Sequence, residues 1–563
     1  MSADVHATLR GVHLDDTVRT SSTLGHAPHA VWCADYGRCV NEDRRVGQAT
    51  TADADRATRR DGTATPPIGV ASAFRIDRDR IAVSPFFARL GGVTQVVSGT
   101  DAGVLHNRLT HSLKVAQVAR AVADRINASA EYGALAEKLG GCDPEVAEAA
   151  ALGHDLGHPP FGHLGEQVLD HIARERFGLA DGFEGNAQSF RILTTTDVRG
   201  PSGVGLDLTA AVRAAVLKYP WARSRYPQPH PSTMDVPPRG AAESSEAPGS
   251  GSSKFSAYVT ELDDVDQARA PFADAIERWQ QTIEASVMDT ADDIAYAIHD
   301  LQDFHRIGVL QHASVSPELG VWLTASRELA HLDDVTLAAH SRRPGYSLEQ
   351  MRRRLHAKDA PMVDDDAFRA AVTTVRTELV DGLLAQVFDG SVESEQALAD
   401  FSARWTSRLV DGVGVTDSPS TRSGHVTLRP QQWHEVQVLK FVHRRFVLLR
   451  PDLALHQRGQ ASLITNLVSE LDSWLSDTRE SSRIPRRLHD LVELAHTEYS
   501  GLAKDRPELL LPPDGTEPPD VASLAKGRAI VDFVASLTDK QGATLLDALA
   551  GRVSAPWSDS FVL

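Results

Sequence analysis

The chain has 563 residues, enough for two or more domains or for one large core with appendages. Its 58 basic and 76 acidic residues give a formal net charge of −18. That acidic balance argues against a general nucleic-acid coat protein, so an anionic ligand must be met by local arginines, lysines or metal. Cys33, Cys39 and Cys142 show neither metal-binding spacing nor a disulfide framework, as expected in a reducing compartment. Without an apolar signal core or a membrane-length apolar run, the sequence predicts a soluble, cytoplasmic protein with no membrane partner.

In chain order, the sequence predicts an N-terminal extension followed by helices. Residues 1–70 lack a sustained period and are interpreted as an extension, loosely ordered at first and tighter near 36–45. A strong helix is predicted after Arg108, because apolar residues then recur at helical spacing. They are Val115, Val118, Val122 and Ile126.

The next helix has clear start and stop signals. Asp143 is a good N-cap, and Pro144 suits the first helical position. The helix should run to His154-Asp155, where Gly157 and Pro159 end it.

The remaining chain is also predicted to be helical. Further helices are expected over residues 167–176, 183–193, 208–217, 273–306, 378–387, 437–449 and 461–475. A flexible Pro/Ser/Gly-rich insertion is expected at about 224–253, loops over 342–365 and 413–428, and only short β-like runs such as 94–97. The predicted fold class is all-α, with an extension over 1–70, a catalytic core over 71–340 and a C-terminal helical region over 341–563.

Residues 152–166 pack three histidines and two carboxylates among glycines and a Pro-Pro pair. A structural segment gains little from this mixture, because each buried imidazole or carboxylate must find a partner. Together they suit a divalent transition-metal ion, which His154 and Asp155 can both reach from a helix end. His163 and Glu166 are neighbours on a helix, an arrangement typical of a working histidine held by its carboxylate. A lone His-Asp pair is more often structural, but the whole cluster predicts metal chemistry.

A second informative stretch is 292–300. Asp292, Tyr296 and Asp300 share one helix face, which could be solvated, but the intervening apolar residues indicate a buried helix whose polar stripe needs a ligand or partners. His111 lies at the start of a helix, where a lone histidine is more often a cap or a core residue. His111, the His154-Asp155 pair and a distant aspartate would nevertheless complete four protein ligands for a metal that accepts five or six.

These motifs resemble the HD-domain phosphohydrolase superfamily and, more narrowly, the deoxynucleoside triphosphate triphosphohydrolases, the dGTPase-like family. The matching sequence segments lie between Arg75 and Arg306 and follow the same order as in the family. They are residues 108–112, 154–166, 183–193, 218–220, 254–255 and 292–300. The resemblance implies an all-α HD-domain core with an additional C-terminal helical region. It also implies an enzyme that cleaves a dNTP to the deoxynucleoside and inorganic tripolyphosphate.

The resemblance assigns roles to particular residues. It implies that a divalent metal ion, Mn²⁺, Mg²⁺, Fe²⁺ or Co²⁺, is held by His111, His154, Asp155 and Asp292. Asp292 is preferred to Asp293, because Tyr296 and Asp300 fall at the family's offsets from it. His163, oriented by Glu166, would protonate the leaving 5′-oxygen. The residues implied at the substrate are Gln95, Arg108, His158, Asn186, Lys218, Lys254, Tyr296 and Asp300.

Within that substrate set, Arg108, Lys218 and Lys254 suit the triphosphate. Gln95, Tyr296 and Asp300 match positions around the deoxyribose, where Tyr296 would crowd a 2′-hydroxyl. The resemblance further implies a homo-oligomer, a tetramer or hexamer, and an activating dNTP beside the substrate. Single-stranded DNA is a partner that the net charge does not support. The chain departs from the family's usual residues at Ala88, Val93 and Gly185.

Two other functions compete with this interpretation. The first is another HD phosphohydrolase, acting on a nucleoside monophosphate or an alarmone, which would release orthophosphate or pyrophosphate instead of tripolyphosphate. The second is a dNTP sensor that has lost catalysis. His163 and Glu166 argue against the sensor, because binding alone does not require them.

Overall fold

The computed structural model of the chain describes residues 51–60, 72–97, 105–197, 205–226, 233–234, 237–241, 251–419, 424–511 and 520–552. All of them belong to one unit, Thr51–Leu563. Residues 1–50 of the predicted extension lie outside the described residues, as does much of the predicted insertion over 224–253.

The described residues up to the centre of the chain form eleven α-helices. They are α1 (Thr51–Arg56), α2 (Ala73–Ala82), α3 (Pro85–Arg89), α4 (Arg108–Ala128), α5 (Ala130–Lys138), α6 (Pro144–Gly153), α7 (His163–Glu175), α8 (Gly185–Arg191), α9 (Ala210–Val216), α10 (Leu262–Arg269) and α11 (Ile283–Arg306).

The described residues beyond α11 add ten more α-helices. They are α12 (His312–Ala330), α13 (Asp334–Ala339), α14 (Tyr346–Lys358), α15 (Asp365–Val375), α16 (Val392–Asp411), α17 (Pro430–His443), α18 (Pro451–Ser476), α19 (Arg486–Asp505), α20 (Val521–Ala535) and α21 (Asp539–Leu549). Strands β1 (Val413–Val415) and β2 (Val426–Leu428) pair antiparallel and make the only sheet among the described residues. The all-α fold class is therefore confirmed, whereas the loop predicted over 413–428 is wrong at both of its ends.

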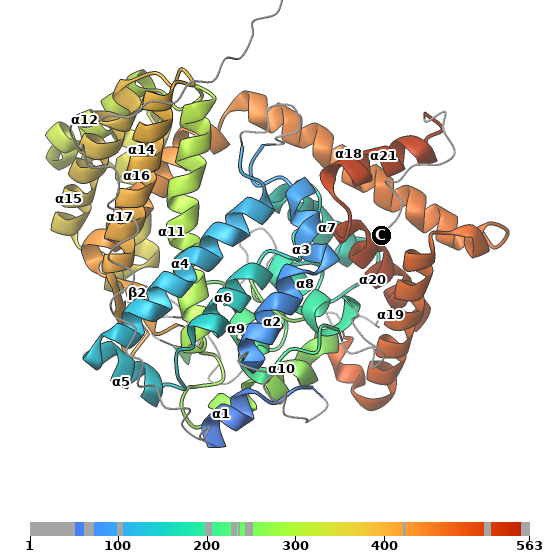
Figure 1. Ribbon diagram of the computed structural model, residues 1–563. Helices are drawn as coiled ribbons and strands as arrows, with labels where there is room; N and C mark the ends of the chain where they lie inside the picture. The colour runs from blue at the N-terminus through green and yellow to red at the C-terminus, as the bar shows by residue number, and fades with distance from the viewer. Residues whose placement is uncertain are drawn as a thin grey trace, which may run out of the picture. The chain divides into compact units, whose positions relative to one another are not determined.

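Helices α4, α6 and α11 form the centre of the unit and pack against one another (Figure 1). Helix α4 begins where Asn107 and Thr110 form a capping box. Its predicted apolar stripe, which includes Val115 and Val122, is fully buried. Helix α6 begins as predicted, with Asp143 accepting two backbone N–H bonds and Pro144 at its first position. The end of α6 lies beside the start of α4, because the ring centroids of His111 and His154 are 5.6 Å apart.

The helices after α11 pack into two different cores. Helices α12 to α17 share the hydrophobic core of α4, α6 and α11, whereas α18 to α21 share a second core with α7. Figure 1 shows the two groups on opposite sides of the central helices. The C-terminal half of the chain therefore borders the central helices from two directions.

The loop predicted over 342–365 is wrong, because α14 occupies most of it. Leu348, Met351 and Leu355 are buried at helical spacing. The sequence concealed this stripe because the arginine run 352–354 separates its members and makes the segment polar on average.

Three smaller expectations also differ from the structure. The helix predicted from residue 273 begins only at Ile283, after Thr282 accepts the Ala285 N–H as its N-cap. The helix predicted over 378–387 is a π-helical turn, η7 (Arg376–Val380), followed by a 3-10 turn, η8 (Leu383–Ala385). Residues 94–97 form no strand, because only Thr94 makes a bridge, to Asn107.

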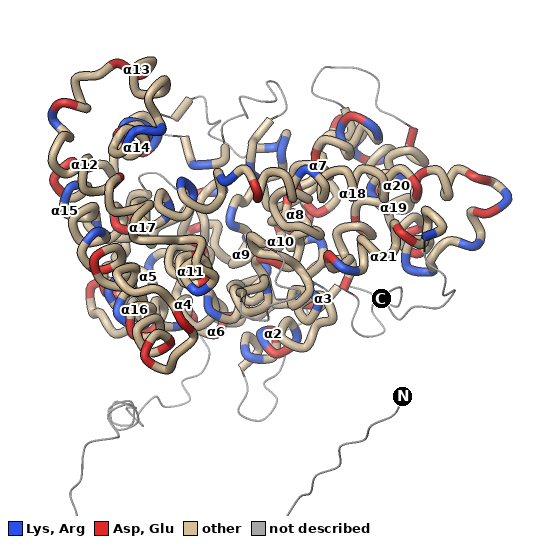
Figure 2. Tube along the Cα trace, turned by 90° about the horizontal axis from the view of Figure 1, so that it is seen from above, with Lys and Arg blue, Asp and Glu red and all other residues tan. Residues whose placement is uncertain are grey.

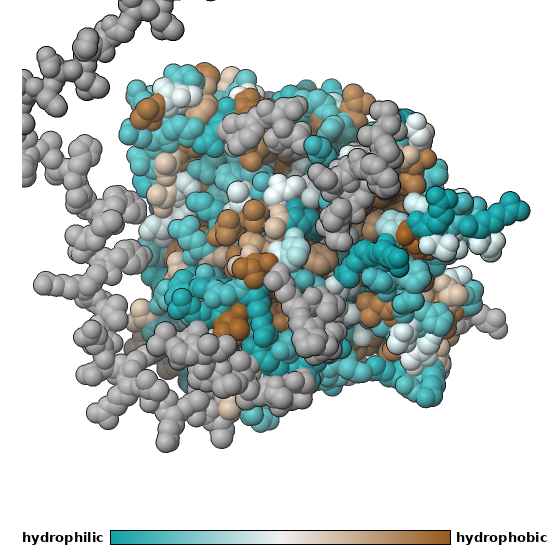
Figure 3. All heavy atoms as spheres, turned by 45° about the vertical axis from the view of Figure 1, so that its right-hand side comes forward, coloured by the Kyte–Doolittle hydropathy of each residue, from teal (hydrophilic) through white to brown (hydrophobic). Residues whose placement is uncertain are grey.

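Charged residues of both signs alternate along the outer helices (Figure 2). On the face drawn in Figure 3, hydrophobic side chains lie in separate places among hydrophilic ones. None of the helices in the described ranges is both long and apolar enough to cross a bilayer. Because charges of both signs are mixed over the outer helices, an anionic ligand would have to be met by local groups.

Candidate metal centre and active site

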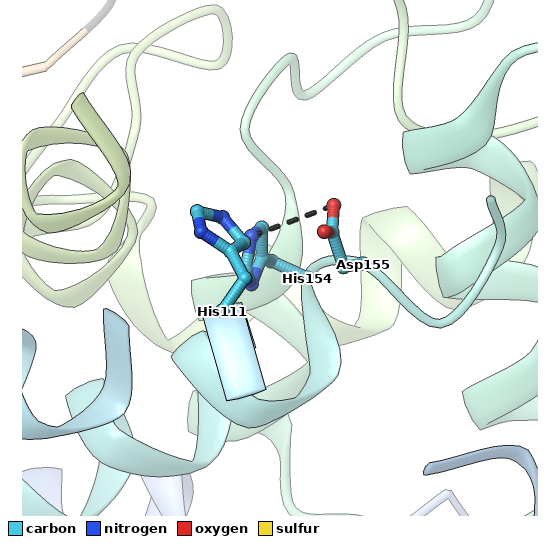
Figure 4. A group of neighbouring side chains, drawn as sticks. All are labelled: His111, His154 and Asp155. Carbon is cyan, nitrogen blue, oxygen red and sulfur yellow. Dashed lines mark ion pairs between the residues drawn. The ribbon is translucent and has the colours of Figure 1, made fainter. Parts of the chain in front are cut away.

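Three helices bring the predicted metal ligands together. His111 lies in the first turn of α4, His154 and Asp155 follow the last turn of α6, and Asp292 lies on α11. All four side chains are largely buried. Figure 4 shows His111, His154 and Asp155 converging from α4 and from the end of α6.

The distances suit a shared ion. The ligand atoms of His111, His154 and Asp155 lie within 4.8 Å of one another. Asp292 Oδ1 lies 3.2 Å from His111 Nε2 and 3.8 Å from His154 Nε2. His154 Nε2 also lies 3.5 Å from Asp155 Oδ1. Two imidazoles and two carboxylates thus border one small volume, the donor set that suits a divalent transition metal.

The tautomer of His154 favours a metal ligand. Its Nδ1 lies 2.6 Å from the Ala151 carbonyl oxygen, and because a carbonyl only accepts, Nδ1 carries the hydrogen. Nε2 is then left with a lone pair. That atom is buried and has no hydrogen-bond partner among the described residues. A buried acceptor without a donor needs a partner, and a cation at this point supplies one.

The pKa shifts at this centre favour the charged forms of Asp155, Asp292 and His111. Burial by itself disfavours the charged carboxylates, but Arg108 and His158 outweigh it and hold the pKa of Asp155 well below its ordinary value. Lys218 and His111 do the same for the pKa of Asp292. Burial opposes the imidazolium of His111, yet the nearby carboxylates outweigh it and raise its pKa. The centre therefore holds ionised carboxylates that attract a cation.

Two predicted phosphate-binding cations contact the metal-ligand carboxylates. Arg108 Nη1 donates to Asp155 Oδ2 at 2.6 Å. Its Nε and Nη2 are buried without a hydrogen-bond partner among the described residues, so they remain for an anionic ligand. Lys218 Nζ lies 2.9 Å from both Asp292 and Asp289.

A second cluster lies next to the first, around the start of α7. His163 is 65% exposed at its side chain, and its Nδ1 lies 3.2 Å from Glu166 Oε2. Lys254 Nζ donates to Glu166 at 2.6 Å and to Glu184 at 2.8 Å. His158 joins the clusters, because its Nδ1 lies 3.0 Å from Asp155 Oδ1 and its Nε2 lies 3.8 Å from Glu166 Oε2.

The pKa shifts divide this second cluster into charged and neutral groups. Burial opposes ionisation of Glu166, but Lys254 and His163 hold its pKa well below the ordinary value. Burial and Arg108 lower the pKa of His158 to about 4, so its ring is neutral near pH 7. Burial raises the pKa of Glu184 despite its contact with Lys254.

Asn186 lies in the first turn of α8, beside this cluster. Its side-chain Nδ2 donates to Glu184 Oε1 at 2.9 Å. Glu184 also accepts the backbone N–H of Asn186 and so caps α8. The same carboxylate therefore holds both Asn186 and Lys254.

Two of the three residues predicted at the deoxyribose, Gln95 and Asp300, line one small pocket. Tyr296 Oη lies 3.2 Å from His443 Nδ1, and Asp300 Oδ2 lies 3.3 Å from the same nitrogen. Burial raises the pKa of Asp300 to about 7. The carbonyl oxygen of the Gln95 side chain is buried without a hydrogen-bond partner among the described residues. A small pocket here is lined by Gln95, Val96, Val97, Leu105, His106, Asp300, Asp303 and Phe304.

Three residues that contact the predicted site residues are not among those predicted from the sequence. Asp289 precedes Asp292 by one helical turn, so helical spacing could have identified it. Glu184 lies within the motif over 183–193, next to Asn186. His443 comes from α17, far along the chain from Tyr296, and no local pattern marks it.

Comparisons with known proteins cover this region and most of the chain. A family model described as the HD domain matches residues 108–192. A deoxyguanosinetriphosphate triphosphohydrolase-like protein of Streptomyces coelicolor is 30% identical over 501 residues, which are 85% of this chain and 93% of that protein. A protein of the same description from Bifidobacterium longum is 29% identical over 466 residues, or 77% and 82%. One from Corynebacterium glutamicum is 36% identical over 243 residues, or 42% and 47%.

Proposed function

Because this chain belongs to the deoxyguanosinetriphosphate triphosphohydrolase-like family of HD-domain proteins, we propose that it hydrolyses a deoxynucleoside triphosphate to the deoxynucleoside and inorganic tripolyphosphate. At a coarser level, that family makes the chain a metal-dependent hydrolase of phosphoester bonds. The observation that supports the finer proposal is that His158 lies between the two clusters. Its ring approaches Asp155 on one side and Glu166 on the other, and Glu166 contacts the exposed His163.

The metal centre fits a divalent ion. His111, the adjacent pair His154-Asp155, and Asp292 would hold it. The observation that favours a cation there is that His154 Nε2 is buried and has no hydrogen-bond partner in the described part of the chain. A bound divalent ion lowers the pKa of water and polarises a phosphoryl oxygen. We propose Mn²⁺, Mg²⁺, Fe²⁺ or Co²⁺, because mixed imidazole and carboxylate ligands suit these ions.

His163 is the proposed proton donor to the 5′-oxygen of the leaving nucleoside. The departing alkoxide is strongly basic, so its expulsion near neutral pH requires a proton. The exposed ring of His163 can reach a bound substrate, and Glu166 beside its Nδ1 fixes the ring's orientation. Nε2 is then left to donate to the substrate.

The cations are proposed to receive the triphosphate. Arg108 has two buried nitrogens that no described residue bonds, and it can form the paired hydrogen bonds that phosphate oxygens accept. Lys218 and Lys254 each contact two carboxylates, which hold the ammonium groups at the site before a nucleotide binds. As point charges they tolerate several phosphate positions.

The test of this function is product analysis. Purified protein with Mn²⁺ or Mg²⁺ is incubated with each of the four dNTPs, and the phosphate products are separated. We expect tripolyphosphate and the free deoxynucleoside. Release of pyrophosphate or orthophosphate would assign the chain to another HD phosphohydrolase. Calorimetric dNTP binding without turnover would make it a sensor.

Sugar selectivity tests the placement of Tyr296. We propose that its ring packs under the deoxyribose, where a 2′-hydroxyl would lose water without gaining a hydrogen bond. Because His443 Nδ1 already faces the Tyr296 hydroxyl, the ring has little freedom to withdraw. That loss predicts a preference for a dNTP over the matching ribonucleotide of about 10- to 100-fold in kcat/KM. Equal hydrolysis of GTP and dGTP would contradict this placement.

A further inference from the structure

Asp539, the first residue of α21, ties two segments of the active site together. Its Oδ1 accepts the Phe161 backbone N–H at 2.8 Å. Its Oδ2 accepts the Thr94 backbone N–H at 3.0 Å and also the Thr94 hydroxyl. The Asp539 side chain is buried, and both of its oxygens are used.

Both tied segments lead directly into the site. Thr94 precedes Gln95 and forms a bridge with Asn107, the residue before Arg108. Phe161 lies two residues before His163, the first residue of α7. One carboxylate therefore contacts the segments that present the proposed sugar, phosphate and proton-transfer groups.

The Phe161–Gly162 turn needs such a tie. Phe161 has a φ of 65°, and Phe161 and Asp207 are the non-glycine residues with positive φ in the described part of the chain. A bulky residue holds this conformation only where its surroundings impose it. Gly162 lies so close to Arg108 and Thr94 that an added Cβ would meet Arg108 Nη2 at 2.9 Å. The turn is therefore fixed between Arg108, Thr94 and Asp539.

Arg89 joins the same C-terminal segment to the residues that precede this turn. The buried Arg89 donates from Nη1 to the Leu537 carbonyl at 2.9 Å. Its Nη2 donates to the carbonyls of Leu156 and His158 at 2.7 and 2.9 Å. The segment over 537–539 thus contacts Phe161 directly and is joined through Arg89 to the carbonyls of Leu156 and His158.

We propose that Asp539 is a positioning residue of the active site, which acts through His163 by holding the Phe161–Gly162 turn against Thr94. The proposal rests on the proposed function, because it assumes that His163 transfers a proton. The C-terminal helices contribute in this way to catalysis without contacting substrate.

Asp539→Asn tests the carboxylate with little change in volume. One side-chain oxygen becomes an NH₂ group, so either the Phe161 N–H or the Thr94 N–H then faces a donor. Helix α21 keeps its start, because Thr538 and Gln541 form its capping box. We expect kcat to fall ~10-fold, more than KM rises, since a small misplacement of a catalytic group has this effect. Asp520→Asn is the matched control, because the exposed Asp520 caps α20.

A double-mutant cycle separates positioning from a general loss of structure. Single-turnover rates per bound metal are measured for Asp539→Asn, His163→Ala and the double variant. If Asp539 acts through His163, Asp539→Asn lowers the rate ~10-fold in the wild-type background and less than ~2-fold in His163→Ala. Equal losses in both backgrounds would overturn the proposal.

Hydrogen exchange provides a measurement independent of turnover. Backbone amides over 156–164 should exchange faster in Asp539→Asn than in wild type or Asp520→Asn. If Asp539→Asn showed the same exchange rates and turnover as the wild type, the role of Asp539 would be refuted and the proposed function would stand. Absence of tripolyphosphate from the wild-type protein would instead refute the proposed function, whatever the exchange result.

Discussion

Asp292 and Asp293 show how one position on a helix decides a side chain's role. Asp292 lies against His111 and Lys218, inside the candidate metal centre. Asp293 turns to another face of α11, where its Oδ1 lies 2.6 Å from Lys440 Nζ. Both carboxylates are partnered, but only Asp292 lies among other metal-type ligands.

We predict that Asp292→Ala loses bound metal and that Asp293→Ala retains it. The first change removes one of four converging donors, whereas the second removes a carboxylate that contacts Lys440 on another face of α11. Metal content after gel filtration, measured by elemental analysis, checks both variants, with thermal melting as a control for folding. A metal-free Asp293→Ala beside a fully loaded Asp292→Ala would reverse the assignment.

We predict that His163→Ala keeps metal and nucleotide binding but lowers turnover ~10²–10⁴-fold, the usual range for general acid–base catalysis. Glu166→Gln should lower it less, because the amide oxygen can still accept from His163 Nδ1 and hold the ring's orientation. Calorimetric binding and single-turnover kinetics on the same preparation distinguish binding from chemistry. A near-normal single-turnover rate for His163→Ala would exclude it as the acid.

At the scale of elements, predictability follows how local the determining signal is. Helix α6 begins where Asp143 and Pro144 indicate and ends at Gly153, just before the predicted end at His154-Asp155, because caps and breakers act within a few residues. Helix α14 is not predicted from the sequence, because the arginine run 352–354 interrupts its buried apolar residues. Only the helices packed against it reveal this face.

The contacts of the site with the C-terminal helices could not be predicted from sequence patterns. His443 reaches Tyr296 across 147 residues, and Asp539 reaches Thr94 across 445. Neither spacing has a period or a local motif. Glu166 and His163, by contrast, lie within one helical turn, so the sequence was sufficient to predict that they meet.

The cap of α6 permits a test at this scale. Asp143→Ala removes the acceptor for the N–H groups of Glu145 and Val146. We predict a loss of about 1 kcal/mol in the free energy of unfolding, the usual effect of losing an N-cap. Metal affinity should stay within about twofold of wild type, because His154 and Asp155 lie at the other end of the helix. Urea unfolding and metal titration measure the two quantities. A loss of metal without a loss of stability would contradict this account.

At the scale of the whole unit, a buried ionic network joins the HD-matched region to the C-terminal helices. Arg191, at the end of α8, is fully buried and bonds Glu261 at 2.5 Å, Glu498 on α19 at 2.8 Å and Asp532 on α20 at 2.8 Å. Three carboxylates thus surround one guanidinium. Burial and the neighbouring Glu498 raise the pKa of Glu261 to about 7, although Arg191 opposes the shift.

This shift predicts how stability depends on pH. In the unfolded chain Glu261 loses its proton near its ordinary pKa of 4.5, whereas the folded protein keeps that proton up to about pH 7. Between these values the folded state binds more protons, so the contribution of Glu261 is full below pH 4.5 and is lost as pH rises through 7. Glu261→Gln, neutral at every pH, should therefore be more stable than wild type at pH 8 by roughly 1–3 kcal/mol, and nearly equal to it at pH 4.5. Unfolding of both proteins at pH 4.5, 6, 7 and 8 measures the difference between their free energies of unfolding. Because the two proteins share their other titrating groups, this difference reports on Glu261. An equal loss of stability in Glu261→Gln at pH 4.5 and pH 8 would instead show that Glu261 remains ionised beside Arg191.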